Sequence, residues 1–263
     1  MKDAYKIFDL EGKSAVITGA TGGLGTAMAR GLGAAGVRVL AADIKEPQGS
    51  LGENVSFRRT DVSVKEEVDA LVEDATMRFG RLDIMVANAA IGGGAKAEEE
   101  TLEGWDKVMD VNARGVFLCD QAAARKMIPQ GGGSIINTAS VLSFIGCPVS
   151  VSYTASKGAI LQITRTLSIE WAKYNIRVNA IAPGFFRTPL NQAYLDSEAY
   201  MKPIVDKIPL ERVGEPPEIV GTVIYLASDA SRFMTGSALI IDGGEMAAGG
   251  YTEGCFPFIY KTI

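Results

Sequence analysis

The chain has 263 residues, with 26 Lys and Arg against 31 Asp and Glu, so its formal net charge is −5, and it contains no histidine. The lack of histidine excludes Ser-His-Asp and Cys-His catalysis and the histidine-bearing zinc and iron centres. The acidic balance argues against binding to nucleic acid or to an anionic membrane surface. Acid–base chemistry must therefore come from Tyr, Lys, Asp, Glu or Cys, and we expect no metal site.

Cysteine usage and hydropathy bear on the compartment. Cys119, Cys147 and Cys255 are odd in number and far apart, which does not suit a disulfide framework or a zinc ribbon. No apolar run approaches the roughly 18–20 residues that span a bilayer. The first residues, MKDAYKIFDLEGK, are too charged for a secretory signal. The sequence thus predicts a cytoplasmic protein without a membrane segment.

Short apolar runs alternate along the chain with longer amphipathic stretches. The runs predict strands at 14–18, 37–42, 55–60, 82–87, 133–139, 176–181 and 238–242. Helices are expected near 24–35, 64–79, 103–128, 151–174 and 216–228. Most of the runs are continuously apolar, which is typical of parallel strands covered on both faces. The repeated alternation predicts a single α/β domain over 1–263 with a parallel sheet and right-handed crossovers.

Two segments fall outside this alternation. Residues 184–215 contain three prolines and follow the carboxyl end of a predicted strand, where a substrate lid would lie in an open α/β sheet. Residues 245–263 follow the final strand and carry four aromatic side chains, Tyr251, Phe256, Phe258 and Tyr260. Four aromatic residues in a tail predict docking on another surface.

The turn after the first predicted strand is rich in glycine. Gly19, Gly23 and Gly25 have the spacing G-x-x-x-G-x-G within the run TGATGGLG. A pyrophosphate needs bare backbone at such a turn and the N-terminus of the helix that follows it. A glycine turn alone also occurs without any ligand, but its place between strand and helix favours a dinucleotide site.

Asp43 ends the second predicted strand, 24 residues after Gly19. A carboxylate at this position accepts hydrogen bonds from the adenosine ribose and repels a 2′-phosphate. Position 22 is Gly rather than a basic residue, and Ile44 follows Asp43, so these positions favour NAD over NADP. Asp43 alone would also suit the cap of a helix.

Tyr153 and Lys157 open the longest predicted helix with the spacing Y-x-x-x-K. Residues four apart lie on one face of a helix, about one turn from each other. A phenol with a pKa near 10 is a poor base at neutral pH, and a neighbouring ammonium favours the phenolate. Because this spacing is common by chance, its function depends on neighbouring residues.

Two polar residues from other predicted elements supply such neighbours. Ser140 follows the fifth predicted strand, so its hydroxyl lies at the carboxyl edge of the sheet and can bond to a substrate oxygen. Asn112, in the predicted helix 103–128, offers an amide to hold a water near Lys157. Each alone suits a structural role, Ser140 as a cap and Asn112 as a buried amide. Together with Tyr153 and Lys157 they predict a catalytic group.

In chain order, the motifs resemble those of the short-chain dehydrogenase/reductase family. They are TGATGGLG at 18–25, Asp61-Val62, Asn88-Ala89-Ala90, Asn112, Ser140, Tyr153 with Lys157, Pro183-Gly184 and Asp242-Gly243-Gly244, and they span about residues 10–246. The resemblance implies a one-domain Rossmann fold, with a doubly wound seven-stranded parallel sheet in the order 3-2-1-4-5-6-7, helices on both faces, and a homotetramer. It also implies a tetrad in which Tyr153 is the acid and base, Ser140 the substrate anchor, Lys157 the pKa tuner and Asn112 the water holder.

The resemblance further implies the residues that hold NAD. Asp61 and Val62 would border the adenine, Asn88 to Ala90 the ribose, and the stretch from Pro183 to Thr188 the nicotinamide end. The complete expected set is Gly19, Thr21, Gly23, Leu24, Gly25, Asp43, Ile44, Asp61, Val62, Asn88, Ala89, Ala90, Tyr153, Lys157, Pro183, Gly184, Phe186 and Thr188. The family's N-N-A-G reads Ala87-Asn88-Ala89-Ala90 here, and the tail after Gly244 is longer than is common. We expect this tail to dock across a subunit interface.

Two blocks, IFDLEGKSAVITGA and the stretch from GGGSIINTAS to NAIAPGFF, most resemble gluconate 5-dehydrogenases and related deoxygluconate and sugar-alcohol dehydrogenases. The expected reaction interconverts a secondary alcohol and a ketone on a sugar, sugar acid or polyol. The alternatives are a 3-oxoacyl-carrier-protein reductase, a steroid-type hydroxyl dehydrogenase and a non-catalytic dinucleotide-sensing protein. Carrier-protein enzymes usually have basic residues near positions 22 and 43–44, and a sensor should lack the Tyr or the Lys, so this chain departs from both patterns.

The substrate pocket would be partly apolar. It is expected to be formed by Leu142, Phe144, Cys147, Phe185 and the segment 187–210. If the substrate carries a carboxylate, Arg187, Lys202 or Arg212 is in a position to receive it. Each of these three also suits an ordinary solvated surface charge.

Overall fold

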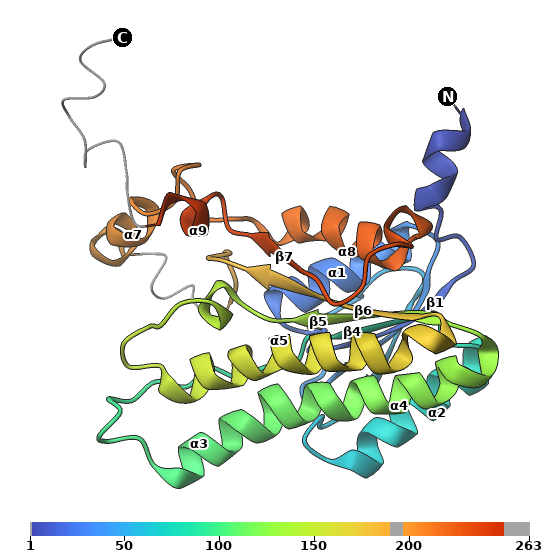
Figure 1. The fold of residues 1–263 in the computed structure, drawn as a ribbon, viewed down its shortest axis with the longest axis horizontal. Coiled ribbons are helices and arrows are strands. Elements are labelled where there is room, and N and C mark those ends of the chain that lie inside the picture. Colours follow the sequence, from blue (N-terminus) through green and yellow to red (C-terminus); the bar gives the residue numbers. More distant parts are fainter. Residues whose placement is uncertain (1, 190–196, 250–263) are drawn as a thin grey trace.

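The computed structural model describes residues 2–189 and 197–249. They form three layers, a central sheet with helices on each of its two faces (Figure 1). The strands are β1 (Ser14–Thr18), β2 (Arg38–Asp43), β3 (Val55–Arg59), β4 (Ile84–Ala87), β5 (Gly133–Thr138), β6 (Ile176–Pro183) and β7 (Ala238–Ile241). They are all parallel, in the order β3-β2-β1-β4-β5-β6-β7. The predicted fold class and strand order are confirmed. The order reverses between β1 and β4, and ligands of open α/β sheets bind beyond the carboxyl ends of such strands.

Helices cover both faces of the sheet (Figure 1). One face carries α1 (Gly23–Ala34) and α8 (Val220–Ala227), and the other carries α2 (Lys65–Phe79), α4 (Gly115–Gln130) and α5 (Val151–Trp171). Three shorter helices are α3 (Leu102–Met109), α7 (Glu198–Val205) and α9 (Glu245–Ala248). Single 3-10 turns or helices span Lys2–Phe8, Val141–Ser143, Ala172–Tyr174, Pro216–Ile219 and Asp229–Ser231.

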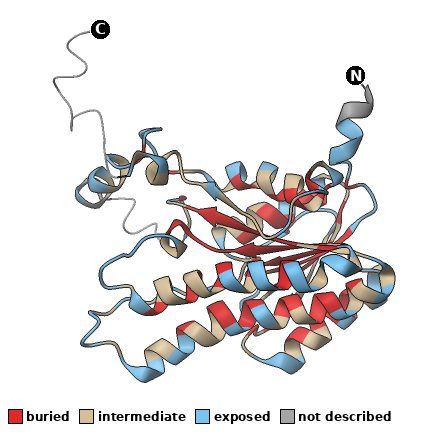
Figure 2. Cartoon of the chain, viewed as in Figure 1, coloured by how far each residue is buried: buried red, intermediate tan, exposed pale blue. Residues whose placement is uncertain are grey.

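Successive residues of the central strands belong to two separate cores. Val16 and Met85 lie in the core that contains α2, α4 and α5, whereas Ile17 and Val86 lie in the core that contains α1 and α8. All four side chains are fully buried, and the sheet is accordingly red in Figure 2. Because neither face of these strands meets solvent, their sequences are continuously apolar rather than alternating.

The structure departs from the predicted elements in the long helix and in the lid segment. The predicted helix 103–128 is divided into α3, a π-helical segment at Asp110–Arg114, and α4. The sequence pattern did not reveal the π-helical turn, although such turns are frequent at functional sites. The segment 184–215 contains α7, which was not predicted because Pro203 lies inside it and proline usually ends a helix. The 3-10 helix at Lys2–Phe8 was not predicted either.

Some expectations fall on residues 190–196 and 250–263, which lie outside the described residues. These include part of the lid segment and the aromatic residues of the tail, so the docking of the tail stays a prediction. Within 2–189 and 197–249 no helix combines the length and the apolar character needed to cross a bilayer. The same residues contain no cluster of three or more Cys, Asp or Glu that could ligate a metal ion. The cytoplasmic location stays a prediction.

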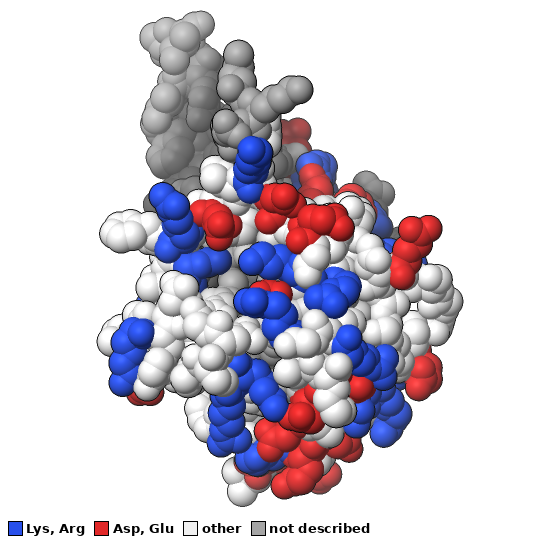
Figure 3. Space-filling view, turned by 90° about the vertical axis from the view of Figure 1, so that its right-hand side faces the viewer, with Lys and Arg blue, Asp and Glu red and all other residues white. Residues whose placement is uncertain are grey.

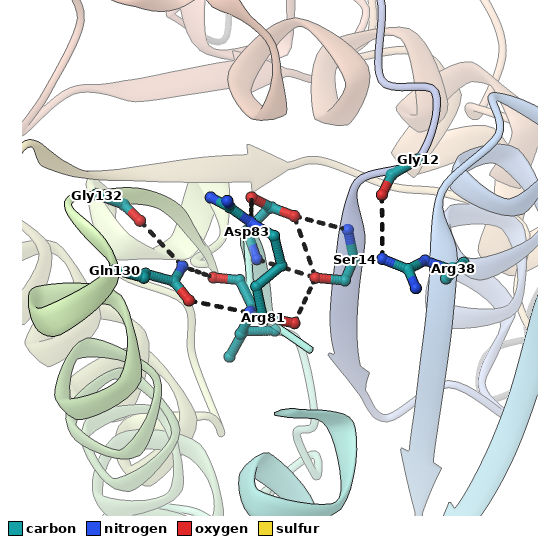
Figure 4. A network of polar contacts seen from close by, with 8 residues as sticks. Gly12, Ser14, Arg38, Arg81, Asp83, Gln130 and Gly132 are labelled. Carbon is teal, nitrogen blue, oxygen red and sulfur yellow. Dashed lines mark hydrogen bonds and ion pairs between the residues drawn. The ribbon is translucent and has the colours of Figure 1, made fainter. Parts of the chain in front are cut away.

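A polar network joins the amino ends of β1 and β4 (Figure 4). The Oδ2 atom of Asp83 accepts hydrogen bonds from the backbone N of Ser14 at 2.9 Å and from its Oγ at 3.1 Å. The Oδ1 atom of Asp83 pairs with Nε of Arg81 at 2.7 Å, and the Oγ of Ser14 also donates to the Arg81 carbonyl at 2.7 Å. Asp83 is buried. The network therefore fixes the two strands whose opposite ends form the switch point.

We expect Asp83→Ala to lower the free energy of unfolding by about 2 kcal/mol, because it leaves the buried N–H of Ser14 without its acceptor. Asp69→Ala is the matched control, since its ion pairs with Lys65 and Arg125 are exposed. That control should change the free energy by less than about 0.5 kcal/mol. Urea unfolding measures both variants, and equal losses would contradict the role of the network.

Candidate active site

The turn between β1 and α1 has no room for a side chain at Gly19 or Gly25. Gly19 has a φ of +66°, and a Cβ there would lie 2.7 Å from the Cα of Ala89. A Cβ at Gly25 would lie 2.0 Å from the carbonyl oxygen of Gly19. Only glycine fits both positions without a shift of the backbone. The N-cap residue of α1 is Gly22, which has no side chain to cap the first turn, so that turn presents its N–H groups to an anion.

A cleft of about 920 Å³ opens at this turn, a size at the upper end of ordinary ligand sites. The predicted cofactor residues that line it are Gly19, Gly23, Leu24, Gly25, Asp43, Ile44, Asp61, Val62, Asn88, Ala89, Ala90 and Thr188. The predicted set did not include Gly22, Thr60, Ser63, Ile91, Glu103, Asp106, Lys107, Asp110 and Val111, which also line it. Thr60 and Ser63 flank the predicted pair at 61–62. The α3 side of the cleft was missed because nothing in the sequence fixes which face of that helix turns inward.

Asp43 holds its carboxylate at the cleft through two backbone bonds. Its Oδ2 accepts from the N of Thr21 at 3.0 Å, and its Oδ1 accepts from the N of Lys45 at 3.2 Å. Thr21 is not among the described residues that line the cleft, so it acts on Asp43 rather than on the cleft wall. The alternative role of Asp43 as a helix cap is wrong, because the next described element after β2 is the strand β3.

Asn88 secures the glycine turn to the end of β4. Its Nδ2 donates to the carbonyl oxygens of Thr18 at 3.0 Å and Gly19 at 3.2 Å, and its backbone N donates to the Oγ1 of Thr18 at 3.0 Å. Ala90, where the family motif has glycine, is exposed within the cleft. Its methyl group therefore has space, and the departure from the motif leaves the turn intact.

The predicted nicotinamide end is only partly at the cleft. Thr188 lines it, whereas Pro183, Gly184 and Phe186 are not among the described lining residues. Phe186 is 5% exposed, and its backbone neighbours bond to Gly214, with Arg187 N donating to the Gly214 carbonyl at 2.8 Å. The side chain of Phe186 therefore packs in the core, and the cofactor contact predicted for this residue stays a prediction. Residues 184–188, which follow β6, place Thr188 at the cleft.

Tyr153, in the first turn of α5, lies close to Ser140, which follows β5. Burial raises the pKa of the Tyr153 phenol, and the hydrogen bond with Ser140 opposes this effect. Ser140 also caps the short helix that follows it, since its Oγ accepts from the N of Leu142 at 3.1 Å. Ser140 thus has the capping role and the contact with Tyr153 at once.

Lys157 lies beside Tyr153, as the spacing predicted. Its Nζ is 5.6 Å from the centroid of the Tyr153 ring and donates to the carbonyl oxygen of Thr138 at 2.8 Å. The side chain is buried, and burial lowers the pKa of Lys157 to about 8. The Thr138 carbonyl holds the Lys157 ammonium, and burial raises the pKa of the phenol in the protein without ligands. The role of Lys157 in lowering the Tyr153 pKa during the reaction stays a prediction.

Asn112 lies in the π-helical segment, and its hydrogen bonds connect the cleft to the group of Tyr153 and Lys157. Its Oδ1 accepts from the N of Ile91 at 2.8 Å, and its Nδ2 donates to the Ile91 carbonyl at 2.9 Å and to the Oγ of Ser156 at 3.1 Å. Both amide hydrogens are therefore used, and only one lone pair of Oδ1 is left for the water predicted there. Ser156, which was not predicted, donates in turn to the carbonyl of Tyr153 at 2.7 Å.

The basic residues expected to receive a substrate carboxylate all have acidic partners. Arg187 pairs with Glu215 at 3.1 Å, Lys202 with Asp206 at 2.9 Å, and Arg212 with Glu218 at 2.7 Å. Glu218 holds Arg212 with both carboxylate oxygens, and this pairing lowers the pKa of Glu218 to about 2. These pairs favour the alternative of surface charges. Of the predicted pocket residues, Phe144, Cys147 and Phe185 are exposed.

A Rossmann-type sheet with a dinucleotide-sized cleft and a Tyr-Lys-Ser group defines a class of nicotinamide-linked oxidoreductases. A family model described as Enoyl-(Acyl carrier protein) reductase matches residues 19–245. The chain belongs to the short-chain dehydrogenase/reductase family, and it is an oxidoreductase of the kind that acts on hydroxyl groups.

Relatives of known name are similar over nearly the whole chain. The 2-dehydro-3-deoxy-D-gluconate 5-dehydrogenase of Dickeya dadantii (strain 3937) is 43% identical over 247 residues, which cover 91% of this chain and 98% of that protein. The 5-keto-D-gluconate 5-reductase of Escherichia coli (strain K12) is 36% identical over 250 residues, 92% of this chain and 98% of that protein. The gluconate 5-dehydrogenase from Burkholderia cenocepacia J2315, solved in complex with NADP and tartrate, has a TM-score of 0.88 and 37% identity, over 93% of this chain and 99% of that chain.

Proposed function

We propose that the protein is an NAD-dependent dehydrogenase that interconverts a secondary alcohol and a ketone on a sugar acid. The observation that carries the proposal is the group of Tyr153, Ser140 and buried Lys157, joined through Asn112 to the dinucleotide-sized cleft. The similarity to relatives named for deoxygluconate and keto-gluconate supports a sugar acid as substrate. Turnover of sugar acids with NAD, followed by the absorbance of the reduced nicotinamide, tests it.

The charges around the cleft support NAD over NADP. Five acidic residues line it, Asp43, Asp61, Glu103, Asp106 and Asp110, whereas Lys107 is the one base among the described lining residues. Like charges repel most strongly where solvent is limited, so this wall opposes the added charge of a 2′-phosphate. On the face at the amino ends of the strands, Lys and Arg side chains are interspersed with Asp and Glu (Figure 3).

The residues present suit the cofactor. The turn at Gly19 and Gly25 leaves bare backbone for a pyrophosphate, and Asp43 presents a fixed carboxylate for the ribose hydroxyls. When bound, NAD supplies the acceptor for a hydride from the carbinol carbon. Ser140 would hold the substrate oxygen while the deprotonated Tyr153 takes its proton. Lys157, as an ammonium, stabilises the negative charge on the phenol oxygen.

The rise in the rate of alcohol oxidation with pH should reflect the loss of a proton from the Tyr153–Lys157 pair. Alcohol oxidation needs the pair to lose a proton, so kcat/KM rises with pH through an apparent pKa that belongs to both groups. Lys157→Met removes the ammonium and leaves the phenol buried. We expect that apparent pKa to move upward by at least about one unit, and kcat/KM at neutral pH to fall about 100-fold.

Lys173→Met is the matched control for this change. The Nζ of Lys173 lies 5.0 Å from the ring of Tyr174, so the variant removes a similar ring–ammonium contact at an exposed position. Its pH profile should equal that of the wild type. An unchanged profile in Lys157→Met would contradict the coupling.

The preference for NAD depends on the charge of Asp43. Asp43→Asn keeps the shape of the side chain and an oxygen for the Thr21 N–H, but it removes the charge. We expect the ratio of kcat/KM with NAD to that with NADP to fall at least about 10-fold in Asp43→Asn and further in Asp43→Ala. Steady-state kinetics with both cofactors measures the ratio. A wild-type protein that already prefers NADP would show that Asp43 does not decide the cofactor.

A second candidate is a reductase of 3-oxoacyl carrier-protein thioesters, which is supported by the similarity to the 3-oxoacyl-[acyl-carrier-protein] reductase of Thermotoga maritima, 38% identical over 244 residues. Reduction of a 3-oxoacyl thioester that exceeds the turnover of sugar acids would select it. The sensor alternative is disfavoured because Tyr153 and Lys157 are both present and adjacent. We also propose a homotetramer, as is usual for the family, and sedimentation velocity that shows a monomer would reject it.

A further inference from the structure

A buried carboxyl group on α4 has no part in the reaction described above. Asp120 is fully buried, and its Oδ2 accepts from the Nδ2 of Asn137 in β5 at 2.9 Å. Asn137 is also fully buried, and its Nδ2 donates a second hydrogen bond to the Oγ1 of Thr164 in α5 at 3.1 Å. The three side chains therefore join α4, β5 and α5 inside the core.

Two oxygens of this group have no partner. The Oδ1 of Asp120 and the Oδ1 of Asn137 are both buried, and neither has a hydrogen-bond partner among the described residues. They belong to the same two planar groups that the Oδ2–Nδ2 bond already joins. Two unpaired acceptors in a core are costly. A proton on the Asp120 carboxyl turns one of them into a donor for the other.

No cation among the described residues faces Asp120 to stabilise an ionised carboxylate. Its neighbour on α4 is the buried thiol of Cys119, and on α5 the ammonium of Lys157 is held by the Thr138 carbonyl. The other charged groups on the elements around α4 are paired elsewhere, as in Glu73–Lys126, Asp110–Arg114 and the bonds of Arg177 to the Leu226 and Ser228 carbonyls. Burial raises the pKa of Asp120 to about 8, against the opposing effect of Asn137.

We propose that Asp120 is a neutral carboxylic acid at pH 7, that its Oδ1–H donates to the Oδ1 of Asn137, and that this closed acid–amide pair positions Lys157. The next residue after Asn137 is Thr138, whose carbonyl accepts from the Nζ of Lys157 at 2.8 Å. Asn137 also holds Thr164, about two turns beyond Lys157 on the same helix. The positioning of Lys157 rests on the proposed function, whereas the protonation of Asp120 does not.

Infrared difference spectroscopy tests the protonation without any assay of activity. Asp120→Asn keeps the shape of the side chain and forms an amide–amide pair, which closes both hydrogen bonds without the carboxyl proton. The C=O band of a protonated carboxylic acid should appear in wild type at pH 6 and 7, be absent in Asp120→Asn, and disappear above about pH 8. The absence of this band from wild type at pH 6 would overturn the proposal.

The stability of the same two proteins gives a second readout. The pKa of Asp120 is higher in the folded chain than the ordinary value of 3.8, so the folded state binds more protons between the two values. The stability of wild type relative to Asp120→Asn must therefore fall as the pH rises from about 4 to about 8, and then stay level. Urea unfolding across this range measures it. A difference that does not change with pH would overturn the proposal.

The pH profile of Asp120→Ala tests the positioning of Lys157. This variant leaves the Asn137 amide unpaired, and we expect kcat to fall about 10-fold with KM unchanged and the apparent pKa of kcat to shift. Asp120→Asn should restore both values. If Asp120→Ala does not fold, the comparison of wild type with Asp120→Asn still tests the positioning role. The ratio of the kcat of Asp120→Asn to that of wild type should increase above pH 8.

Two kinetic outcomes would overturn the positioning role. They are a pH profile of Asp120→Ala equal to that of wild type, and an Asp120→Asn enzyme as impaired as Asp120→Ala. Inactivity of the wild type itself would reject the proposed function instead. In that case the infrared band and the pH-dependent stability still decide the protonation of Asp120.

Discussion

Tyr153→Phe is expected to lower kcat for alcohol oxidation by about 10³-fold, while the affinity for NAD and the fold stay unchanged. The substitution removes only the phenol hydroxyl, and the ring keeps its packing beside Lys157. The absorbance of the reduced nicotinamide measures turnover, and calorimetry measures the binding of NAD.

Tyr174→Phe is the control for this variant. Tyr174 has its own ammonium neighbour, Lys173, but it lies at the end of α5 away from Ser140. Its turnover should equal that of the wild type. A Tyr153→Phe enzyme that keeps wild-type turnover would show that another group takes the proton. With no histidine in the chain, that group would have to be another Tyr, Lys, Asp, Glu or Cys.

Gly25→Ala should weaken NAD binding about 10- to 100-fold, because its Cβ would lie 2.0 Å from the carbonyl oxygen of Gly19. The glycine turn must then shift away from the position that α1 and Asn88 give it. Gly22→Ala is the matched control in the same turn. Its Cβ would lie 3.5 Å from the same oxygen, an ordinary contact, at a φ of −78°.

Calorimetric titration of both glycine variants with NAD decides between them. We expect Gly22→Ala to bind within about threefold of wild type, since neither its space nor its backbone angle opposes a methyl group. Equal affinities in Gly25→Ala and Gly22→Ala would mean that the cofactor does not use the bare backbone of this turn.

The sheet was predictable because its strands are buried on both faces. Continuous apolar runs such as SAVIT at Ser14–Thr18 have no other common explanation between two helical segments, and Asp43 marks the end of β2 directly. Tyr153, Lys157 and Ser140 were predictable for a related reason. Each follows or faces the carboxyl end of a strand, where an α/β sheet collects its functional residues.

Other features depend on three-dimensional burial, which a sequence does not record. The apolar pattern did not reveal the π-helical segment that carries Asn112, and the acidic residues of α3 reach the cleft because of how that helix packs. Burial raises the pKa of Tyr153, and the spacing of Tyr153 and Lys157 does not reveal how deeply the phenol is buried. The sequence also does not show that the ring of Phe186 packs in the core against Gly214.

The central claim is that this family member oxidises a sugar acid with NAD. It is tested most directly by steady-state kinetics of the full chain with both cofactors. Sugar acids and polyols are assayed as alcohols to be oxidised with NAD or NADP, and a 3-oxoacyl thioester is assayed as a ketone to be reduced with the reduced cofactors. We predict the highest kcat/KM for a sugar acid with NAD. A preference for NADP, or turnover of the thioester with none of the sugar acids, would contradict the account.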